Sequence, residues 1–233
     1  MEARSVIDFL KLIDSKELEP TTFYRGHACK SWLLLPSIAR IAKPPHGNLI
    51  LSGWQGVESF LIESFKKKSV PYMDFVPENR LEWLVHGQHH GLPTSLLDWT
   101  SNALKGLFFA VENPVFDSED GIVYAGVADE WVTDTNAIEK IDRIICFESR
   151  HINSRLIAQE GCFTAFPLPD GFGEFASIKD DESESDLSIW GEILIPAERK
   201  VSIRKQLKKY GITYQSLFPG LEGITKSLIR EFE

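Results

Sequence analysis

The stretch between Trp83 and Val111 constrains the fold most, because it places polar side chains within otherwise apolar sequence. Asp98 and Trp99 stand inside an apolar run, and three of the six histidines of the chain precede them: His86, His89 and His90. A buried polar group without a hydrogen-bond partner costs about 1–3 kcal/mol, so these side chains require partners. The stretch is therefore either a buried polar network that fixes the fold or the wall of a binding site.

The composition is that of a soluble globular protein, with 233 residues of which 43% are hydrophobic and 25% charged. This length predicts one domain spanning residues 1–233. A formal net charge of -9 argues against a surface that follows nucleic-acid phosphates but leaves room for a local basic groove. Cys29, Cys146 and Cys162 form no CxxC pair, which excludes a cysteine-rich zinc ribbon and fits a reducing, cytoplasmic location.

Both ends of the chain carry simple signals. Residues 1–20 combine acidic residues with a helical period, so we expect an N-terminal helix and no signal peptide. No apolar run approaches about 20 residues, the length that a membrane-spanning helix needs, so we expect no membrane association. Residues 167–187 contain the acidic run KDDESESD, which predicts a solvated loop with room to move.

Hydrophobic periodicity and capping residues predict helices early in the chain and strands late in it. The expected helices cover residues 5–14, 51–68, 79–90, 102–112, 197–210 and 221–232, with a helical turn at 153–159. The expected strands cover residues 21–27, 121–128, 144–147, 161–166 and 188–195. Because strands and helices do not alternate regularly, we predict an α+β fold with a mixed, mainly antiparallel sheet and a helical N-terminal half.

The three clustered histidines allow a metal site but do not require one. Their spacing of i, i+3 and i+4 places them on one helix face, where Asp98 or Glu82 could add a ligand. The alternative is that they donate hydrogen bonds or line a cleft. No second pair of ligands with matching spacing occurs elsewhere in the chain, and the HExxH motif is absent, so we expect no metal.

Arg25 and Asp98 are the two charged candidates with the clearest alternatives. Arg25 ends a predicted strand beside Gly26, and a planar guanidinium with a glycine next to it suits a phosphate or pyrophosphate. The alternative is a partly buried ion pair with a carboxylate such as Asp98. Asp98 is in turn either a catalytic carboxylate or the residue that locks the turn and caps the helix from Asn102.

Several motifs resemble the FRG domain family, and together they cover nearly the whole chain. They are Phe23-Tyr24-Arg25-Gly26-His27, Trp32-Leu33-Leu34-Leu35-Pro36-Ser37 with Arg40, Gln88-His89-His90-Gly91-Leu92-Pro93-Thr94, Leu96-Leu97-Asp98-Trp99-Thr100, Leu107-Phe108-Phe109-Ala110, Arg155 with Gln159, Gly161, Phe163 and Thr164, and Leu217-Phe218-Pro219-Gly220-Leu221-Glu222-Gly223. The chain departs from the pattern at Ser95, where an arginine is expected, and at Gly220 and Glu222, where aspartates are expected. The loss of the arginine removes one candidate anion ligand.

A second, more distant resemblance is to ADP-ribosyltransferases of the arginine–serine–glutamate type. It implies Arg25 as the phosphate ligand, Thr94 or Thr100 as the middle residue, and Glu192 in the segment GEILIP as the catalytic carboxylate. Gln159 or Glu160 is the alternative source of the late polar group. The resemblance implies NAD as substrate, with Tyr24 or Trp99 stacking on the nicotinamide while the carboxylate stabilises an oxocarbenium-like transition state.

These resemblances define an expected site and function. The site has Arg25, Glu192, Thr94 and His89 as catalytic residues, and Tyr24, Gly26, His27, Gln88, His90, Asp98, Trp99 and Gln159 as ligand-binding residues. We expect NAD-dependent ADP-ribosyl transfer or NAD cleavage in a toxin or phage-defence effector, with a protein or nucleic acid as a candidate acceptor. The alternatives are a non-catalytic module that binds a nucleotide or a partner protein, and a metal-dependent hydrolase built on the histidines.

Overall fold

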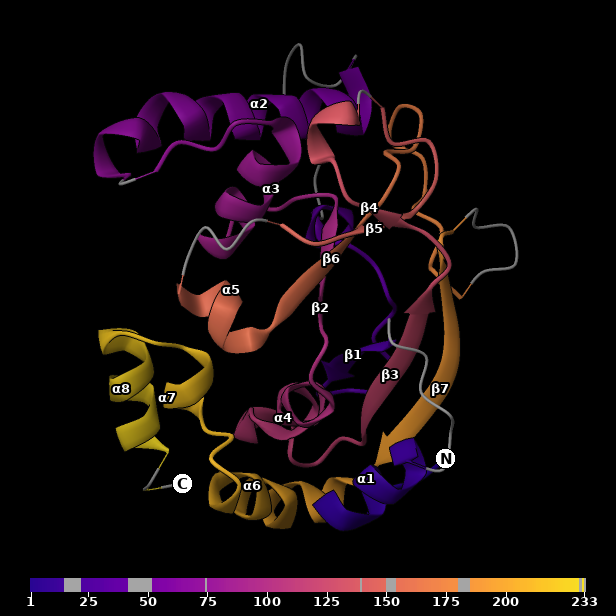
Figure 1. Cartoon of the computed structure of the whole chain (residues 1–233), viewed down its shortest axis with the longest axis vertical. Coiled ribbons are helices and arrows are strands. Elements are labelled where there is room, and N and C mark those ends of the chain that lie inside the picture. The colour runs from indigo at the N-terminus through magenta and orange to yellow at the C-terminus, as the bar shows by residue number, and fades with distance from the viewer. Residues whose placement is uncertain are drawn as a thin grey trace.

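A computed structural model describes residues 1–14, 22–41, 52–73, 75–138, 140–149, 154–179, 185–230 and 232. Its helices are α1 (Val6–Asp14), α2 (Gly53–Ser69), α3 (Arg80–His89), α4 (Ala103–Val111), α5 (Ser154–Gln159), α6 (Lys200–Lys209), α7 (Tyr214–Leu217) and α8 (Leu221–Ile229). Its strands are β1 (Thr22–His27), β2 (Leu96–Thr100), β3 (Gly121–Ala128), β4 (Trp131–Val132), β5 (Ile145–Phe147), β6 (Gly161–Ala165) and β7 (Leu187–Ile195). Helices α2 and α3 lie at one end of the molecule and α1 and α6 at the other (Figure 1).

The strands form one sheet in the order β4-β5-β6-β2-β1-β3-β7. Every neighbouring pair is antiparallel except β4 and β5, which are parallel. The predicted α+β fold with a mixed, mainly antiparallel sheet is therefore confirmed. No helix among the described residues is long and apolar enough to cross a membrane.

The sheet is split between β1 and β2. Strand β1 pairs with β3 along its whole length, from Thr22 opposite Val127 to His27 opposite Ile122. Strands β1 and β2 have one register pair among the described residues, Tyr24 opposite Thr100. The two strands therefore diverge beyond this pair, and the C-terminal half of β1 faces a gap in the hydrogen-bond ladder instead of a neighbouring strand.

The helix ends follow from capping residues that the sequence makes visible. Ser5 accepts a hydrogen bond from the backbone N–H of Asp8 at the start of α1, and Asn79 accepts one from Glu82 at the start of α3. Asn102 caps α4 through the N–H groups of Leu104 and Lys105. The suggestion that Asp98 caps this helix is therefore wrong, because Asp98 lies within β2.

Two glycines bring β1 and α4 into close contact. A Cβ atom on Gly26 would lie 2.1 Å from the backbone oxygen of Gly106, and one on Gly106 would lie 2.6 Å from the Cβ of Tyr24. The chain that approaches Gly26 closely is thus α4 of the protein itself. This packing buries Leu107, Ala110 and Val111 against the sheet and fixes the position of the strand that carries Arg25.

The predicted acidic loop of residues 167–187 is described only in part. Residues 166–179 have no helix or strand, and β7 starts at Leu187 instead of Ser188. Residues 180–184, which hold most of the acidic run, lie outside the described part of the chain. The cysteines Cys29, Cys146 and Cys162 are all free thiols, and the last two are buried.

Candidate functional site

A cavity of about 780 Å³ opens at the split between β1 and β2. This volume lies within the range of small-molecule sites. The cavity wall includes most of the predicted site residues: Tyr24, Arg25, Gly26, His27, Gln88, His89, Asp98, Trp99 and Gln159. Thr94, His90 and Glu192 are not part of the wall. The motif containing Arg25 and the motif containing Asp98 thus belong to one concave surface.

Arg25 is held by neutral acceptors and not by a carboxylate. Its Nε donates to Nε2 of His27 at 2.9 Å, and its Nη1 donates to the backbone oxygen of Asp98 at 2.5 Å. Among the described residues it forms no ion pair, so the suggested closed pair with Asp98 is wrong. Burial lowers the pKa of Arg25 to about 10, and nearby Asp98 opposes this shift. The guanidinium stays charged at neutral pH and has no ion-pair partner among the described residues, which favours an anionic ligand.

His27 connects Arg25 to the loop that follows β1. Because Nε2 of His27 accepts from Arg25, its Nδ1 carries the hydrogen and donates to the backbone oxygen of Trp32 at 3.2 Å. Burial, with the Arg25 charge as a second cause, lowers the pKa of His27 to about 3. His27 is therefore neutral at physiological pH, and its ring rigidly links the side chain of Arg25 to the backbone of Trp32.

A second hydrogen-bonded chain orients Asp98. The amide nitrogen of Gln88 donates to Oδ1 of Asp98 at 2.8 Å. The amide oxygen of Gln88 accepts from the hydroxyl of Thr94, which is fully buried. Thr94 therefore lies behind the wall and contacts the cavity only through Gln88. The polar cluster of the sequence is therefore both a buried hydrogen-bond network and part of a cavity wall.

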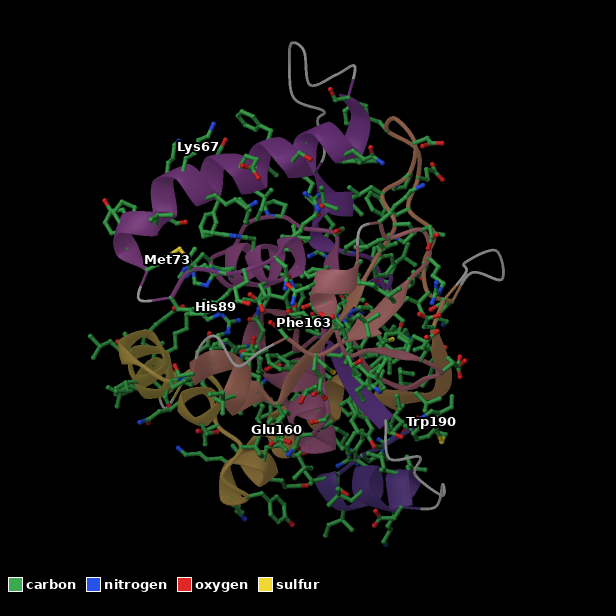
Figure 2. All side chains as sticks on the ribbon, turned by 45° about the horizontal axis from the view of Figure 1, so that its top comes forward. Lys67, Met73, His89, Glu160, Phe163 and Trp190 are labelled. Carbon is green, nitrogen blue, oxygen red and sulfur yellow. The ribbon has the colours of Figure 1, made fainter. Side chains whose placement is uncertain are left out.

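The rings of the clustered histidines pack edge-on against one another and do not converge on a common metal position. The His90 ring lies edge-on to His86 and His89, with centroids 5.0 and 4.9 Å apart. Among the described residues no group of three or more His, Cys, Asp or Glu could hold a metal ion. Burial, followed by the Arg155 charge, lowers the pKa of His89 to about 4. Figure 2 shows His89 on the side of the molecule where the C-terminal helices, drawn in yellow, lie.

The cavity wall concentrates positive charge in an acidic protein. Arg40 and Arg155 line it together with Arg25, against two carboxylates, Asp98 and Glu112. Glu112 pairs with Arg230 at 3.1 Å, so it does not neutralise these arginines. Asp98 forms no ion pair among the described residues. The wall therefore combines cationic groups with one unpaired carboxylate.

The predicted stacking residues lie mostly inside the core. Tyr24 and Trp99 are 4% and 3% exposed, and the indole nitrogen of Trp99 donates to Thr164. The aromatic residue that is open to the cavity is Trp32, which is 43% exposed. Its ring centroid lies 4.9 Å from that of Phe116 in an edge-to-face arrangement. Trp32 and Phe116 therefore offer a more exposed aromatic surface to a ligand than Tyr24 and Trp99 do.

Of the polar residues from the C-terminal half that were predicted for the site, Gln159 lines the cavity and Glu192 and Glu160 do not. Glu192 lies opposite Tyr124, which in turn lies opposite Arg25, so all three share one sheet face. Glu192 is two strands from Arg25, roughly 10 Å, and pairs with Lys179 at 2.6 Å. Gln159 lines the cavity, and its amide donates to the Leu217 oxygen. Its neighbour Glu160 pairs with Lys105 and is not part of the wall.

Residues 20–119 match the FRG domain family. This segment is an FRG domain. No curated protein and no solved structure matches the chain. The FRG segment supplies β1, α3, β2 and α4, and with them Arg25, Gln88 and Asp98. Arg155 and Gln159 contribute to the cavity wall from outside the matched segment, and β3, β4, β5, β6 and β7 complete the sheet.

The departures from the FRG pattern lie away from the cavity. Ser95 is 1% exposed, and its backbone N–H donates to the buried carboxylate of Glu58 at 2.7 Å. The Ser95 side chain is not part of the cavity wall. Gly220 precedes α8 with φ of 114°, and Glu222 pairs with Lys226 on the surface.

Sequence reasoning did not assign site roles to Trp32, Arg40 and Arg155, although all three stand in motifs that resemble the family. Arg40 ends a short 3-10 helix (Ser37–Arg40), and Arg155 lies on α5 with its guanidinium 4.5 Å from the centre of the Phe218 ring. The available signal was charge, because both are arginines within motifs of an acidic chain. It could not show that they face the same cavity as Arg25.

Proposed function

We propose that the cavity binds NAD as a substrate and cleaves the bond between nicotinamide and ribose. The observation that carries this proposal is that one cavity wall holds both a guanidinium, Arg25, and a carboxylate, Asp98, and that neither forms an ion pair among the described residues. When the bond between nicotinamide and ribose breaks, positive charge develops on the ribose, while the phosphates of the dinucleotide are negatively charged. The site therefore needs a cation near the phosphates and an anion near the ribose. The two groups provide this combination at one site.

The phosphates are the part of the ligand that the arginines would bind. Arg25 is already fixed by His27 and Asp98, so little side-chain entropy is lost when it takes a phosphate oxygen. Arg40 lies near enough to lower the pKa of Arg25 and is exposed. A guanidinium pair of this kind suits a pyrophosphate, because each planar fork can bind two oxygens.

Asp98 and His89 would carry out the chemical step. The C1′–N bond breaks, and its electron pair leaves with nicotinamide, which becomes neutral. The Asp98 carboxylate stabilises the oxocarbenium-like ribose that remains. Water, or a nucleophile on a protein or nucleic acid, then bonds to C1′ and loses its proton to His89, which is neutral because its pKa is lowered to about 4. In this scheme Thr94 positions Asp98 through Gln88. Asp98, and not Glu192, is the carboxylate that stabilises the transition state.

Release of nicotinamide from NAD, followed by chromatography, tests the proposal. Asp98→Asn keeps the acceptor for Gln88 but removes the charge, so we expect turnover to fall by about 100-fold or more, as when a transition-state group is lost. Glu192→Gln is the matched control, since this residue lies outside the cavity wall, and it should retain turnover. Absence of nicotinamide release by the wild-type protein, with and without candidate acceptors, would reject the enzyme.

A second candidate function is non-catalytic recognition of a nucleotide. It is favoured by the position of Glu192, which lies outside the cavity wall and pairs with Lys179, so the carboxylate that the ADP-ribosyltransferase resemblance implies is not available in the cavity. Calorimetry with NAD and ADP-ribose separates the two functions. A recognition module gives saturable heat with NAD and no nicotinamide, whereas an enzyme gives product.

A toxin or phage-defence role follows from the same proposal, because NAD cleavage depletes a cofactor that every cell needs. Expression of the wild-type chain in a bacterial host should lower cellular NAD and arrest growth, and Asp98→Asn should do neither. Transfer of a labelled ADP-ribose group to protein or nucleic acid would identify an acceptor. Growth arrest by both forms, with unchanged NAD, would point to a different role.

A further inference from the structure

We infer that Trp32 and Phe116 form a stacking platform for the planar base of the bound nucleotide. This inference rests on the proposed function and extends it by assigning a base subsite next to the phosphate subsite at Arg25. Trp32 is 43% exposed although its indole is among the largest apolar side chains. It lines the cavity together with Phe116, and the two rings lie 4.9 Å apart at 85°.

The position of Trp32 relative to Arg25 is fixed by two hydrogen bonds. Arg25 donates to one ring nitrogen of His27 at 2.9 Å, and the other ring nitrogen bonds the backbone oxygen of Trp32 at 3.2 Å. The backbone N–H of Trp32 donates in addition to the oxygen of Cys29. A guanidinium and an exposed indole are thus joined through one rigid imidazole, which sets the spacing that a phosphate and a base must match.

Phe116 is fixed from the other side by a buried lysine. Lys200 on α6 is 1% exposed, and its Nζ donates to the backbone oxygens of Ala28 and Phe116 at 2.6 and 2.7 Å. Ala28 directly follows β1 in the segment that leads to Trp32, and Phe116 ends a short 3-10 helix (Pro114–Phe116). The platform therefore exists before ligand binding, which lowers the entropic cost of stacking a base on it.

Asn113 adds a polar group beside the aromatic rings. It lines the cavity, and its side-chain oxygen accepts from the N–H of Val115 at 3.2 Å. This bond turns the amide so that its NH₂ group remains as a donor, with no partner among the described residues. A platform with one adjacent donor suits a heteroaromatic base that carries an acceptor, such as a purine or a nicotinamide.

Competition binding with two ligands of the same phosphate chemistry tests the inference. ADP-ribose carries a base and inorganic pyrophosphate does not. We expect Trp32→Ala to weaken ADP-ribose binding by about 5- to 150-fold, the effect of losing one stacked base. Pyrophosphate affinity should change by less than about twofold, since Arg25 and Arg40 bind it. Trp32→Phe, which keeps an aromatic face, should restore most of the ADP-ribose affinity.

Fluorescence gives a readout that a purely structural role of Trp32 would not change. Stacking of a base on the indole should quench tryptophan emission in the wild-type protein, and Trp32→Phe should abolish the quench while ADP-ribose still binds. Trp190→Phe is the matched control, because Trp190 is a tryptophan on β7 that is not part of the cavity wall. It should keep the quench.

The outcomes separate this inference from the proposed function. Equal weakening of ADP-ribose and pyrophosphate by Trp32→Ala would overturn the base subsite and leave the phosphate subsite standing. Unchanged ADP-ribose affinity in Trp32→Ala would overturn the subsite as well. If the wild-type protein binds neither ADP-ribose nor pyrophosphate, the proposed function fails and the base subsite fails with it.

Discussion

The guanidinium of Arg25 and the backbone oxygen of Asp98 lie 2.5 Å apart across the split in the sheet. Strands β1 and β2 pair through Tyr24 and Thr100 and then separate, so a carbonyl on the edge of β2 needs a donor from elsewhere. Arg25 provides it. A side chain thus takes the place of a ladder hydrogen bond, and the space that a paired strand would fill becomes the cavity.

Arg25→Ala should remove ligand binding and cost some stability, because this residue has both roles. The unpaired Asp98 carbonyl should cost about 1–3 kcal/mol, which corresponds to a decrease in Tm of about 2–4 °C per kcal/mol for a chain of this size. Arg25→Lys keeps the charge but cannot reach both acceptors, so its NAD affinity should be intermediate. Calorimetry and thermal unfolding measure the two effects. Undiminished NAD binding by Arg25→Ala would contradict the phosphate subsite.

His27 should make the protein less stable as the pH falls. Its ordinary pKa is 6.5 and its pKa in the folded protein is about 3, so between these values the unfolded chain binds a proton that the folded chain does not. Stability is therefore complete above about pH 6.5 and decreases toward pH 3, with a slope of at most about 1.4 kcal/mol per pH unit from this residue. Urea unfolding between pH 7 and pH 4 measures the slope.

The matched variant for this prediction is His27→Gln. Its amide oxygen can accept from Arg25 and its amide nitrogen can donate to the Trp32 carbonyl, but it does not titrate. The slope of unfolding free energy against pH should therefore be smaller in the variant. Part of the slope should remain, since the pKa of His89 is also lowered, to about 4. Identical slopes in the two proteins would show that the pKa of His27 is not lowered in the folded protein.

The fold could be predicted in part from the sequence, because helix caps and strand alternation are local signals. Ser5, Asn79 and Asn102 marked helix starts that the structure has. Strand β2 has no counterpart among the predicted elements, since Leu96–Thr100 is short and carries an aspartate. The split in the sheet depends on the register between segments more than 70 residues apart, and no local pattern encodes it.

The candidate site was predictable where polar residues cluster in sequence and not where they come together only in space. Gln88, His89 and Asp98 lie close in the chain and share the cavity wall. Glu192 lies in a segment with the alternating pattern of a strand, but this pattern does not show how many strands separate it from Arg25 in the sheet. Trp32 looks like an ordinary core residue in an apolar segment, and its exposure depends on how the loop after β1 folds.

Thr94→Val should reduce turnover more than it reduces binding. Valine matches the shape of threonine but removes the hydroxyl that donates to Gln88, which leaves the Gln88 oxygen without this partner and frees the amide to rotate away from Asp98. In the proposed reaction kcat should fall by about tenfold for roughly 1.4 kcal/mol of lost transition-state stabilisation, with KM almost unchanged. Steady-state kinetics measure both. Ser216→Ala, on the exposed α7 cap, is a control that should change neither.

Lys200→Met should loosen the cavity wall from a position outside it. Methionine fills a similar volume but cannot donate to the backbone oxygens of Ala28 and Phe116, so one buried and one part-buried carbonyl lose this partner, at a cost of about 1–3 kcal/mol for the buried one. We expect a lower unfolding free energy and a several-fold weaker ADP-ribose affinity, because the loops beside Trp32 are no longer held together. Lys205→Met, on the exposed face of the same helix, should change neither quantity. Full affinity in Lys200→Met, together with reduced stability, would show that the lysine stabilises the fold without shaping the cavity.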